Sequence, residues 1–205
     1  MDTTPSWDGR DPVDMDAPVD VLSRDTVYRG KVFDVEDMRL ALHTVAGGTI
    51  EIRRQVLRHA PCVVMLVHDT TDDRYLVERE YRVGCDRFAY GIPAGLMDAG
   101  EDIETAALRE LAEETGVTPI DPAHVTIDHV GECYSSEGMA DELAHIMVIH
   151  LDGHETGPTR LDPDEHVESA WVGWDDLLAL PVTASNSVIA IQHERIRRIL
   201  AGTGH

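Results

Sequence analysis

The sequence predicts an α/β fold in which a mixed central sheet is covered by helices on both faces, with a smaller subdomain of antiparallel strands ahead of it. Two observations lead to this prediction. Short segments of β-branched and apolar residues, separated by turn residues, recur along the chain and are typical of strands. Residues 101–115 and 185–200 instead show the apolar spacing of amphipathic helices. One helix between strands and one after them favour an α/β/α sandwich.

The chain divides into three expected regions. Residues 1–24 are rich in Asp and Pro and lack periodicity, so we expect an acidic flexible tail. Residues 25–58 are expected to form the subdomain of antiparallel strands, and residues 59–205 the main domain. With 205 residues, the chain is long enough for one substantial core and such a subdomain.

Each element is assigned from its periodicity and from the turn residues that bound it. Residues 26–43 suit a hairpin and residues 49–57 its return strand. Residues 62–67 are apolar without alternation, which indicates a central strand buried on both faces. The other expected strands are 74–82, 125–133, 143–151 and 167–172, and the expected helices are 101–115, about 175–180, and 185–200.

Charge and cysteine content exclude several classes of function. The net charge of −22 at pH 7 argues against a general nucleic-acid or anionic-membrane surface. No apolar run approaches the roughly 20 residues that a membrane-spanning helix needs. Three cysteines without Cys-x-x-Cys spacing, and no apolar leader, indicate a reducing, cytoplasmic setting.

The most informative stretch runs from residue 95 to residue 117. Its residues at fixed offsets are Gly95, Glu101, Arg109, Glu110, Glu113, Glu114 and Gly116, with apolar Leu111 and Val117. On the expected helix, Glu110, Glu113 and Glu114 stand at i, i+3 and i+4, so their carboxylates share one face. Carboxylates crowded in this way repel one another unless a cation lies between them. Oxygen ligands with room for retained water suit Mg²⁺ or Mn²⁺.

A solvated acidic helix face is the simpler explanation of such a stretch. It would suit an isolated Glu-Glu pair, but it does not account for seven identities at fixed offsets. Arg109 could form only an ordinary i,i+4 pair with Glu113, which is compatible with a role in orienting the glutamates. Gly116 stands where a left-handed helix C-cap is expected. Ahead of the helix, residues 92–95 precede an irregular loop, and their proline and two small residues let the backbone approach a metal ion closely.

The pattern G-x5-E-x7-R-E-U-x-E-E-x-G-U, in which U is a bulky apolar residue, resembles the Nudix box. The chain is thereby similar to the Nudix hydrolases, which split diphosphate linkages in nucleoside diphosphates joined to a second group. The resemblance implies that the carbonyl of Ala94 and the carboxylates of Glu110 and Glu114 bind the metal ion. Glu101 either binds metal or holds the loop, and Arg109 orients the glutamates rather than contacting substrate.

Motifs outside the box look like the ADP-ribose pyrophosphatase branch of this family. They are residues 28–33, 80–82, 92–95, 162–172 and 185–190. In that branch, ADP-ribose is hydrolysed to AMP and ribose 5-phosphate. The resemblance therefore implies a Mg²⁺-dependent diphosphatase that acts on a small nucleoside diphosphate sugar and forms a homodimer. Neither a nucleic-acid partner nor a membrane partner is expected.

The same resemblance implies a general base for the attacking water, a glutamate in a loop well after the box helix. Its counterpart lies within residues 162–168, where Glu165 is favoured and Asp164 is possible. Glu142 is the other candidate. For each of the three, a solvated acidic loop is the alternative, and reach to the metal-bound water is the criterion that separates the two.

Substrate contacts are implied for a few basic and aromatic residues. Arg82 matches an arginine that contacts phosphate or the terminal ribose, although a plain strand-end arginine fits nearly as well. Tyr28 and either Arg53 or Arg54 are the nearest candidates for binding adenine.

Two positions depart from the branch pattern. Gln55 stands where an acidic residue is common, and Glu137 replaces a proline that ADP-ribose enzymes often show. They keep open another substrate for the same chemistry, such as a GDP-sugar, a dinucleotide or an oxidised nucleotide. A non-catalytic nucleotide sensor is a further alternative, but sensors tend to lose box glutamates and this chain keeps them.

Overall fold

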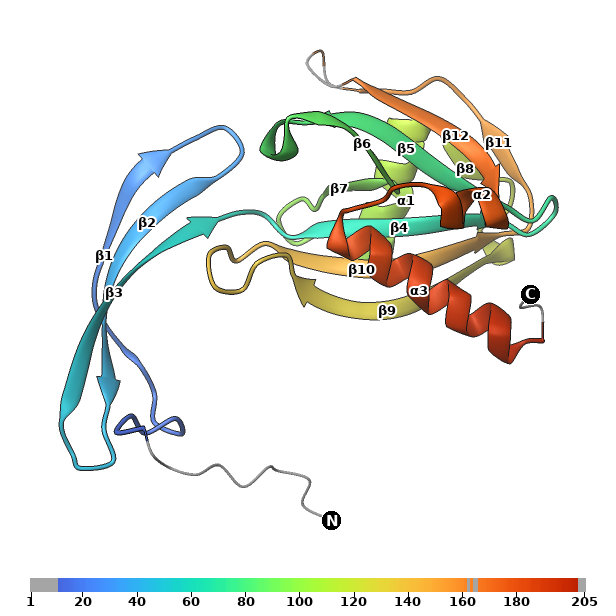
Figure 1. Cartoon of the computed structure of the whole chain (residues 1–205). Helices are drawn as coiled ribbons and strands as arrows, with labels where there is room; N and C mark the ends of the chain where they lie inside the picture. Colours follow the sequence, from blue (N-terminus) through green and yellow to red (C-terminus); the bar gives the residue numbers. More distant parts are fainter. Residues whose placement is uncertain (1–10, 162, 164–165, 203–205) are drawn as a thin grey trace. The chain divides into compact units, whose positions relative to one another are not determined.

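The computed structural model describes residues 11–161, 163 and 166–202, which fold into two compact units (Figure 1). The first unit comprises residues up to 59 together with 138–141, and the second comprises residues 60–137 and those from 142 onward. Residues 138–141 join the first unit through backbone hydrogen bonds. The N–H of Leu57 donates to the carbonyl of Met139 at 2.8 Å, and the N–H of Asp141 donates to the carbonyl of Leu57 at 3.1 Å.

The first unit is a three-stranded antiparallel sheet, in the order β1-β2-β3. Its strands are β1 (Asp20–Arg29), β2 (Asp34–His43) and β3 (Thr49–Arg58). Residues 20–24, which were expected to belong to the flexible tail, lie in β1, where pairing with β2 supplies an order that the local sequence does not signal. Among the described residues of this unit, only Met38 and Ala41 are buried, so the sheet has little core of its own.

The second unit contains a seven-stranded mixed sheet. Its main path is β12-β5-β4-β10-β9, while β6 pairs with β5 and β7 pairs with β4. The strands are β4 (Cys62–Asp69), β5 (Arg74–Arg82), β6 (Arg87–Gly91), β7 (Ala94–Leu96), β9 (Val125–Tyr134), β10 (Leu143–Leu151) and β12 (Val167–Gly173). The pair formed by β4 and β10 is parallel and the other pairs are antiparallel, which confirms the expected mixed sheet.

Helices cover both faces of this sheet, as the α/β/α prediction requires (Figure 1). The helices are α1 (Ile103–Thr115), α2 (Trp174–Ala179) and α3 (Ser185–Leu200). Every residue of β4 is buried, and alternate side chains of this strand face opposite helices. Val63, Met65 and Val67 pack in one cluster with the small and apolar residues of α1. Cys62, Val64 and Leu66 pack in the other cluster, with α2 and α3.

The two central strands separate part of the way along the sheet, and this separation builds the site. Strands β4 and β5 pair directly only from Val67–Leu76 to Asp69–Arg74. Beyond that point, β6 pairs with β5 and β7 pairs with β4, so that the segment joining them enters the gap. The carbonyl of Pro93 in that segment accepts a hydrogen bond from the N–H of Met65 at 2.9 Å.

Four short strands were not expected from the sequence. Besides β6 and β7, they are β8 (Val117–Pro119) and β11 (His154–Thr156), which pair with each other. Ala94 and Gly95, which were expected only to precede a loop, lie in β7. Three-residue strands have too little length for a periodic signal, and a neighbouring strand decides their conformation. Two 3₁₀ turns, Val83–Cys85 and Pro122–His124, complete the elements.

None of the helices within the described residues is both long enough and apolar enough to cross a lipid bilayer.

The ends of α1 follow the sequence signals. The side chain of Asp102 accepts a hydrogen bond from the N–H of Thr105, which caps the first turn. Gly116 ends the helix with φ of 72°, as expected for a left-handed cap. A Cβ at Gly116 would also lie 2.1 Å from the carbonyl oxygen of Gly157. Both the backbone angle and the close approach of a second backbone therefore require glycine here.

We expect Gly116→Ala to lower the free energy of unfolding by about 2 kcal/mol or more, because it adds a backbone clash to an unfavourable φ. Gly202→Ala is the matched control, since Gly202 has φ of 74° after α3 but no atom within 4 Å of its Cβ position. That control should lose only about 1 kcal/mol. Urea unfolding measures both, and equal losses would show that the Gly157 contact is unimportant.

Candidate active site

The side chain of Arg109 on α1 lies at the centre of a carboxylate cluster. Its Nε and Nη2 donate to the two oxygens of Glu101, each at 2.8 Å. Its Nη1 donates to Glu110 at 2.7 Å and to Glu113 at 3.1 Å. Its Nη2 also donates to the carbonyl oxygen of Leu96 in β7 at 3.0 Å. One guanidinium thus joins the loop before α1, two turns of the helix and strand β7.

This arrangement changes the protonation of the carboxylates around it. The Arg109 guanidinium, helped by the backbone N–H of Asp98, lowers the pKa of Glu101 to about 2. Burial raises the pKa of Glu110, and the contact with Arg109 offsets only part of that effect. Because one cation faces the three carboxylates of Glu101, Glu110 and Glu113, negative charge remains in excess. Such an excess favours a further cation.

Two glutamates of α1 also reach the backbone of β7. The N–H of Ala94 donates to Oε2 of Glu114 at 3.3 Å. A Cβ on Gly95 would lie 2.1 Å from Cδ and 2.3 Å from Oε2 of Glu110, so only glycine leaves room for this carboxylate. The backbone of Ala94 and Gly95 and the carboxylates of Glu110 and Glu114 therefore lie together.

The donors at this site are oxygens, which is the ligand type that Mg²⁺ and Mn²⁺ prefer. Glu110 and Glu114, with the carbonyl of Ala94, are the residues that would hold such an ion. Glu101 has the contacts of a residue that holds the loop, because its oxygens accept from Arg109 and from the N–H of Asp98. Across residues 11–161, 163 and 166–202, no group of three His, Cys, Asp or Glu side chains is arranged so that it could hold a metal ion.

The candidates for the general base are placed differently from one another. Asp164 and Glu165 lie outside the described residues. Glu142 stands just before β10, and its carbonyl accepts from the N–H of Ser135 at 3.4 Å. Burial, with a smaller contribution from the charge of Glu142, raises the pKa of the Cys62 thiol to about 12. Cys62 pairs with Leu96 of β7 on one side and with Ala144 of β10 on the other. Glu142, two residues before Ala144, therefore lies near the end of β4 that pairs with β7.

The expected substrate-binding residues have contacts of their own. Arg82 ends β5 and pairs with Glu80 at 2.9 Å, with 56% of its side chain exposed. In the first unit, the Nε of Arg53 donates to both oxygens of Asp37, at 2.8 and 3.0 Å. Arg54 donates to the carbonyl of Arg53 at 2.9 Å.

The Tyr28 ring lies on β1 with its centroid 5.8 Å from that of Phe33. The same ring limits the loop between β1 and β2, because a Cβ on Gly30 would lie 2.8 Å from it. Slightly more than half of the Tyr28 side chain is exposed, so the ring is available to a ligand.

Sequence reasoning missed two features of the second unit. Glu78 on β5 is only 5% exposed, its Oε1 has no hydrogen-bond partner, and burial raises its pKa to about 8. A charged residue after the apolar run from Tyr75 to Val77 is the signal that could have found it. A hollow of about 440 Å³ is lined by Arg79, Phe88, Leu161, His166, Val167 and Glu168. No sequence pattern indicates this hollow, because its walls come from distant segments.

Replacing Arg109 with Met should return the pKa of Glu101 from about 2 toward its ordinary value of about 4.3, because the main cause of the shift is removed. A carboxyl group whose pKa is lower in the folded than in the unfolded chain stabilises the fold at pH values above the unfolded pKa. The native chain should therefore lose the stabilising contribution of Glu101 as the pH falls from about 4.3 to 2. Carbon-13 NMR titration of Glu101 measures the change.

The matched control is Arg160→Met, because Arg160 is 69% exposed and its side chain approaches Glu113 at 3.8 Å without contacting Glu101 among the described ion pairs. Glu101 should titrate in this variant as it does in the native chain. Titration of Glu101 near 2 in Arg109→Met would instead make the N–H of Asp98 the main cause.

Comparison with known proteins agrees with this site. Residues 58–191 match the model of the NUDIX domain family. An ADP-ribose pyrophosphatase of Bacillus subtilis (strain 168) is 30% identical over 185 residues, covering 87% of this chain and 94% of the relative. A Bacillus methanolicus protein named methanol dehydrogenase activator is 29% identical over the same shares of the two chains.

Among solved structures, a crystal structure of an ADP compounds hydrolase matches with a TM-score of 0.67. It covers 91% of this chain and 97% of the other, and at 23% identity it supports the fold alone. The acidic helix, the glycine that admits Glu110 and the family match together show that the chain belongs to the Nudix family of diphosphate hydrolases.

Proposed function

We propose that this Nudix hydrolase cleaves the diphosphate of ADP-ribose, or of a related nucleoside diphosphate sugar, to AMP and ribose 5-phosphate with Mg²⁺ as the cofactor. The observation that carries this proposal is the carboxylate cluster in which Glu110 and Glu114 reach the backbone of β7. Nudix hydrolases generally use divalent metal ions. The name of the B. subtilis relative supports the choice of ADP-ribose.

The chemistry follows from the charges at the site. A divalent ion held by Glu110, Glu114 and the Ala94 carbonyl would offset the charge of the diphosphate and activate water. Arg109 orients the glutamates, as its contacts with Glu110 and Glu113 allow. Water attacks phosphorus, the bond from that phosphorus to the bridging oxygen breaks, and the water proton passes to a general base.

The base is proposed among Glu165, Asp164 and Glu142. The first two follow Leu161, which lines the hollow together with His166. Arg82 shares its face of β5 with Glu80 and Glu78, and we assign it to a phosphate or to the terminal ribose. Adenine is assigned to Tyr28 with Arg53 or Arg54.

We also propose a homodimer in the cytoplasm. A three-stranded sheet needs an apolar face covered by other structure to be stable. Within the first unit Val21, Leu22 and Val27 are exposed on β1, and a second copy of the chain would cover them. The three cysteines are unpaired, which suits a reducing compartment. Sedimentation analysis tests the dimer.

A different nucleoside diphosphate derivative is the second candidate substrate, favoured by Glu137 and Gln55. A panel of ADP-ribose, a GDP-sugar, a dinucleotide and an oxidised nucleotide separates the two. We expect AMP to form fastest from ADP-ribose with Mg²⁺ and no product to form with EDTA. Turnover of another substrate alone would replace the assignment, and binding without any turnover would favour a sensor.

Glu114→Gln should lower turnover by at least about 100-fold, because a charged metal ligand is lost. Glu104→Gln is the control on the same helix, since Glu104 is exposed and pairs with His129 at 2.9 Å. Thermal unfolding should show that both variants remain folded, because neither side chain belongs to the core. Native activity in Glu114→Gln would show that the ligand assignment is wrong.

A further inference from the structure

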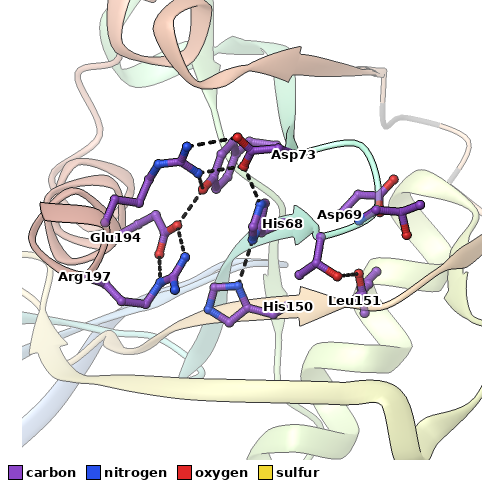
Figure 2. Close-up of polar contacts among 11 residues, drawn as sticks. His68, Asp69, Asp73, His150, Leu151, Glu194 and Arg197 are labelled. Atoms are coloured by element: carbon purple, nitrogen blue, oxygen red, sulfur yellow. Dashed lines mark hydrogen bonds and ion pairs between the residues drawn. The ribbon is translucent and has the colours of Figure 1, made fainter. Parts of the chain in front are cut away.

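Two histidines face each other on the α3 side of the central sheet. His68 on β4 and His150 on β10 are paired neighbours in the parallel ladder. Their Nδ1 atoms lie 3.0 Å apart, and their rings meet edge to face at 85° (Figure 2). The side chains are 8% and 11% exposed, so water does not provide their main hydrogen bonds. The partner of each nitrogen must be found within the protein.

The outer nitrogens of both rings face carboxylates. Nε2 of His68 lies 2.9 Å from Asp73, and Nε2 of His150 lies 3.3 Å from Asp128. Ionised carboxylates only accept hydrogen bonds, so both Nε2 atoms carry a proton. The two Nδ1 atoms cannot both be bare at 3.0 Å, because two lone pairs would then face each other. They cannot both be protonated, because two N–H bonds would collide.

One proton between the Nδ1 atoms satisfies every contact. The four ring nitrogens then hold three protons, and the pair has a single positive charge. His68 is the neutral member, because burial lowers its pKa and this effect, with a contribution from the charge of His150, outweighs the raising effects of Asp73 and Glu194. His150 therefore donates its Nδ1 proton to His68.

The pair is connected to α3 through Asp73. This carboxylate accepts from Arg198 on α3 at 2.7 and 2.9 Å while it also contacts His68. Arg198 donates to the hydroxyl of Tyr75 at 2.9 Å, and that hydroxyl donates to the fully buried Glu194 at 2.5 Å. The Tyr75 ring stacks on His68 with the centroids 4.5 Å apart. A change in the charge of the histidines therefore acts directly on the groups that hold α3.

We propose that His68 and His150 form a buried imidazole–imidazolium pair that binds one shared proton, and that this pair stabilises the contact between the sheet and α3 in a pH-dependent way. Asp73, Asp128, Glu194, Arg197, Arg198 and Tyr75 are the charged and titratable groups around it. The pair lies on the opposite face of β4 from the α1 cluster, so the proposal does not depend on the proposed function.

A metal ion between the histidines is the competing explanation. Histidines that bind metal commonly donate their other nitrogen to a carboxylate, as both do here. Zinc–nitrogen bonds of about 2.0–2.1 Å would, however, force two nitrogens at 3.0 Å into an angle well below tetrahedral. No third His, Cys, Asp or Glu joins them to form a metal site in the part of the chain that the structure describes. A proton fits the observed separation without further ligands.

The shared proton makes the stability of the fold greatest at about pH 6.5, the ordinary pKa of histidine. Below that pH the unfolded chain protonates both histidines, while the folded pair keeps one proton because the pKa of His68 is lowered. A second proton would break the Nδ1 contact and place two positive charges side by side. Above that pH the folded pair still holds a proton that both unfolded histidines have released, so stability falls as the pH rises. One proton gained or lost on unfolding changes the unfolding equilibrium constant by at most tenfold per pH unit.

Nitrogen-15 NMR of histidine-labelled, full-length protein at pH 7 tests the proton count directly. We expect three protonated nitrogens among the four of His68 and His150, with a coupling across the Nδ1–Nδ1 hydrogen bond. Two or four protonated nitrogens would overturn the proposal. So would bare Nδ1 atoms whose signals shift on addition of one equivalent of Zn²⁺, because a metal site would then explain the pair.

The second test compares His150→Gln with His129→Gln between pH 6.5 and 8.5. His129 is the control because it lies on the neighbouring strand β9 but is 54% exposed and pairs with Glu104. As the pH rises through this range, the urea unfolding constant of the native chain and of His129→Gln should increase by up to tenfold per pH unit more than that of His150→Gln, which has no shared proton. Equal slopes in all three would overturn the proposal. Should His150→Gln fail to fold, the proton count in the native chain decides.

Discussion

The contact between Arg109 and its carboxylates constrains the whole region around the α1 helix. Its five hydrogen bonds reach Glu101, Glu110, Glu113 and the carbonyl of Leu96. A planar group with five donors and a permanent charge can satisfy these acceptors at once, whereas an ammonium group cannot. Glutamates that would otherwise repel one another are thereby held close together beside β7. The remaining negative charge makes the same place suitable for a divalent ion and a diphosphate.

That contact depends in turn on how the sheet is built. Because β4 and β5 separate after a short pairing, the segment between β6 and β7 enters the gap and is held by the hydrogen bond from Met65 to Pro93. Gly95 then lies directly beneath Glu110 without a side chain to displace it. The backbone of β7 and the carboxylates of α1 approach each other here because β4 and β5 separate.

The two faces of the sheet use charge in different ways. On the α1 face, a cation shared among carboxylates remains open to ligands, and the excess charge serves binding. On the α3 face, Glu194 is fully buried and accepts hydrogen bonds from Arg197 and Tyr75, with the histidine pair nearby (Figure 2). Buried ion pairs stabilise a fold only when every partner is satisfied. The α3 side is therefore sensitive to a single proton, whereas the α1 side is suited to gain a metal ion.

The local chemistry of the sequence was enough to predict the helix–sheet–helix architecture and the Nudix family to which the chain belongs. The apolar run of β4, the spacing of the α1 glutamates and the glycine at position 116 each act through neighbours along the chain, so periodicity and spacing reveal them. Strand bounds such as those of β5 and β10 agree with the sequence expectation for the same reason. The roles of individual residues at the proposed site stay predictions.

Tertiary structure alone decided which distant groups meet. The strands β6 to β8 and β11 are too short to have a pattern, and pairing partners elsewhere in the chain define them. The buried carboxyl of Glu78, the hollow beside Arg79 and the contact between His68 and His150 join segments that no local signal relates. Their properties depend on burial and on distances between residues that are far apart in the sequence. The order of residues along the chain does not reveal either quantity.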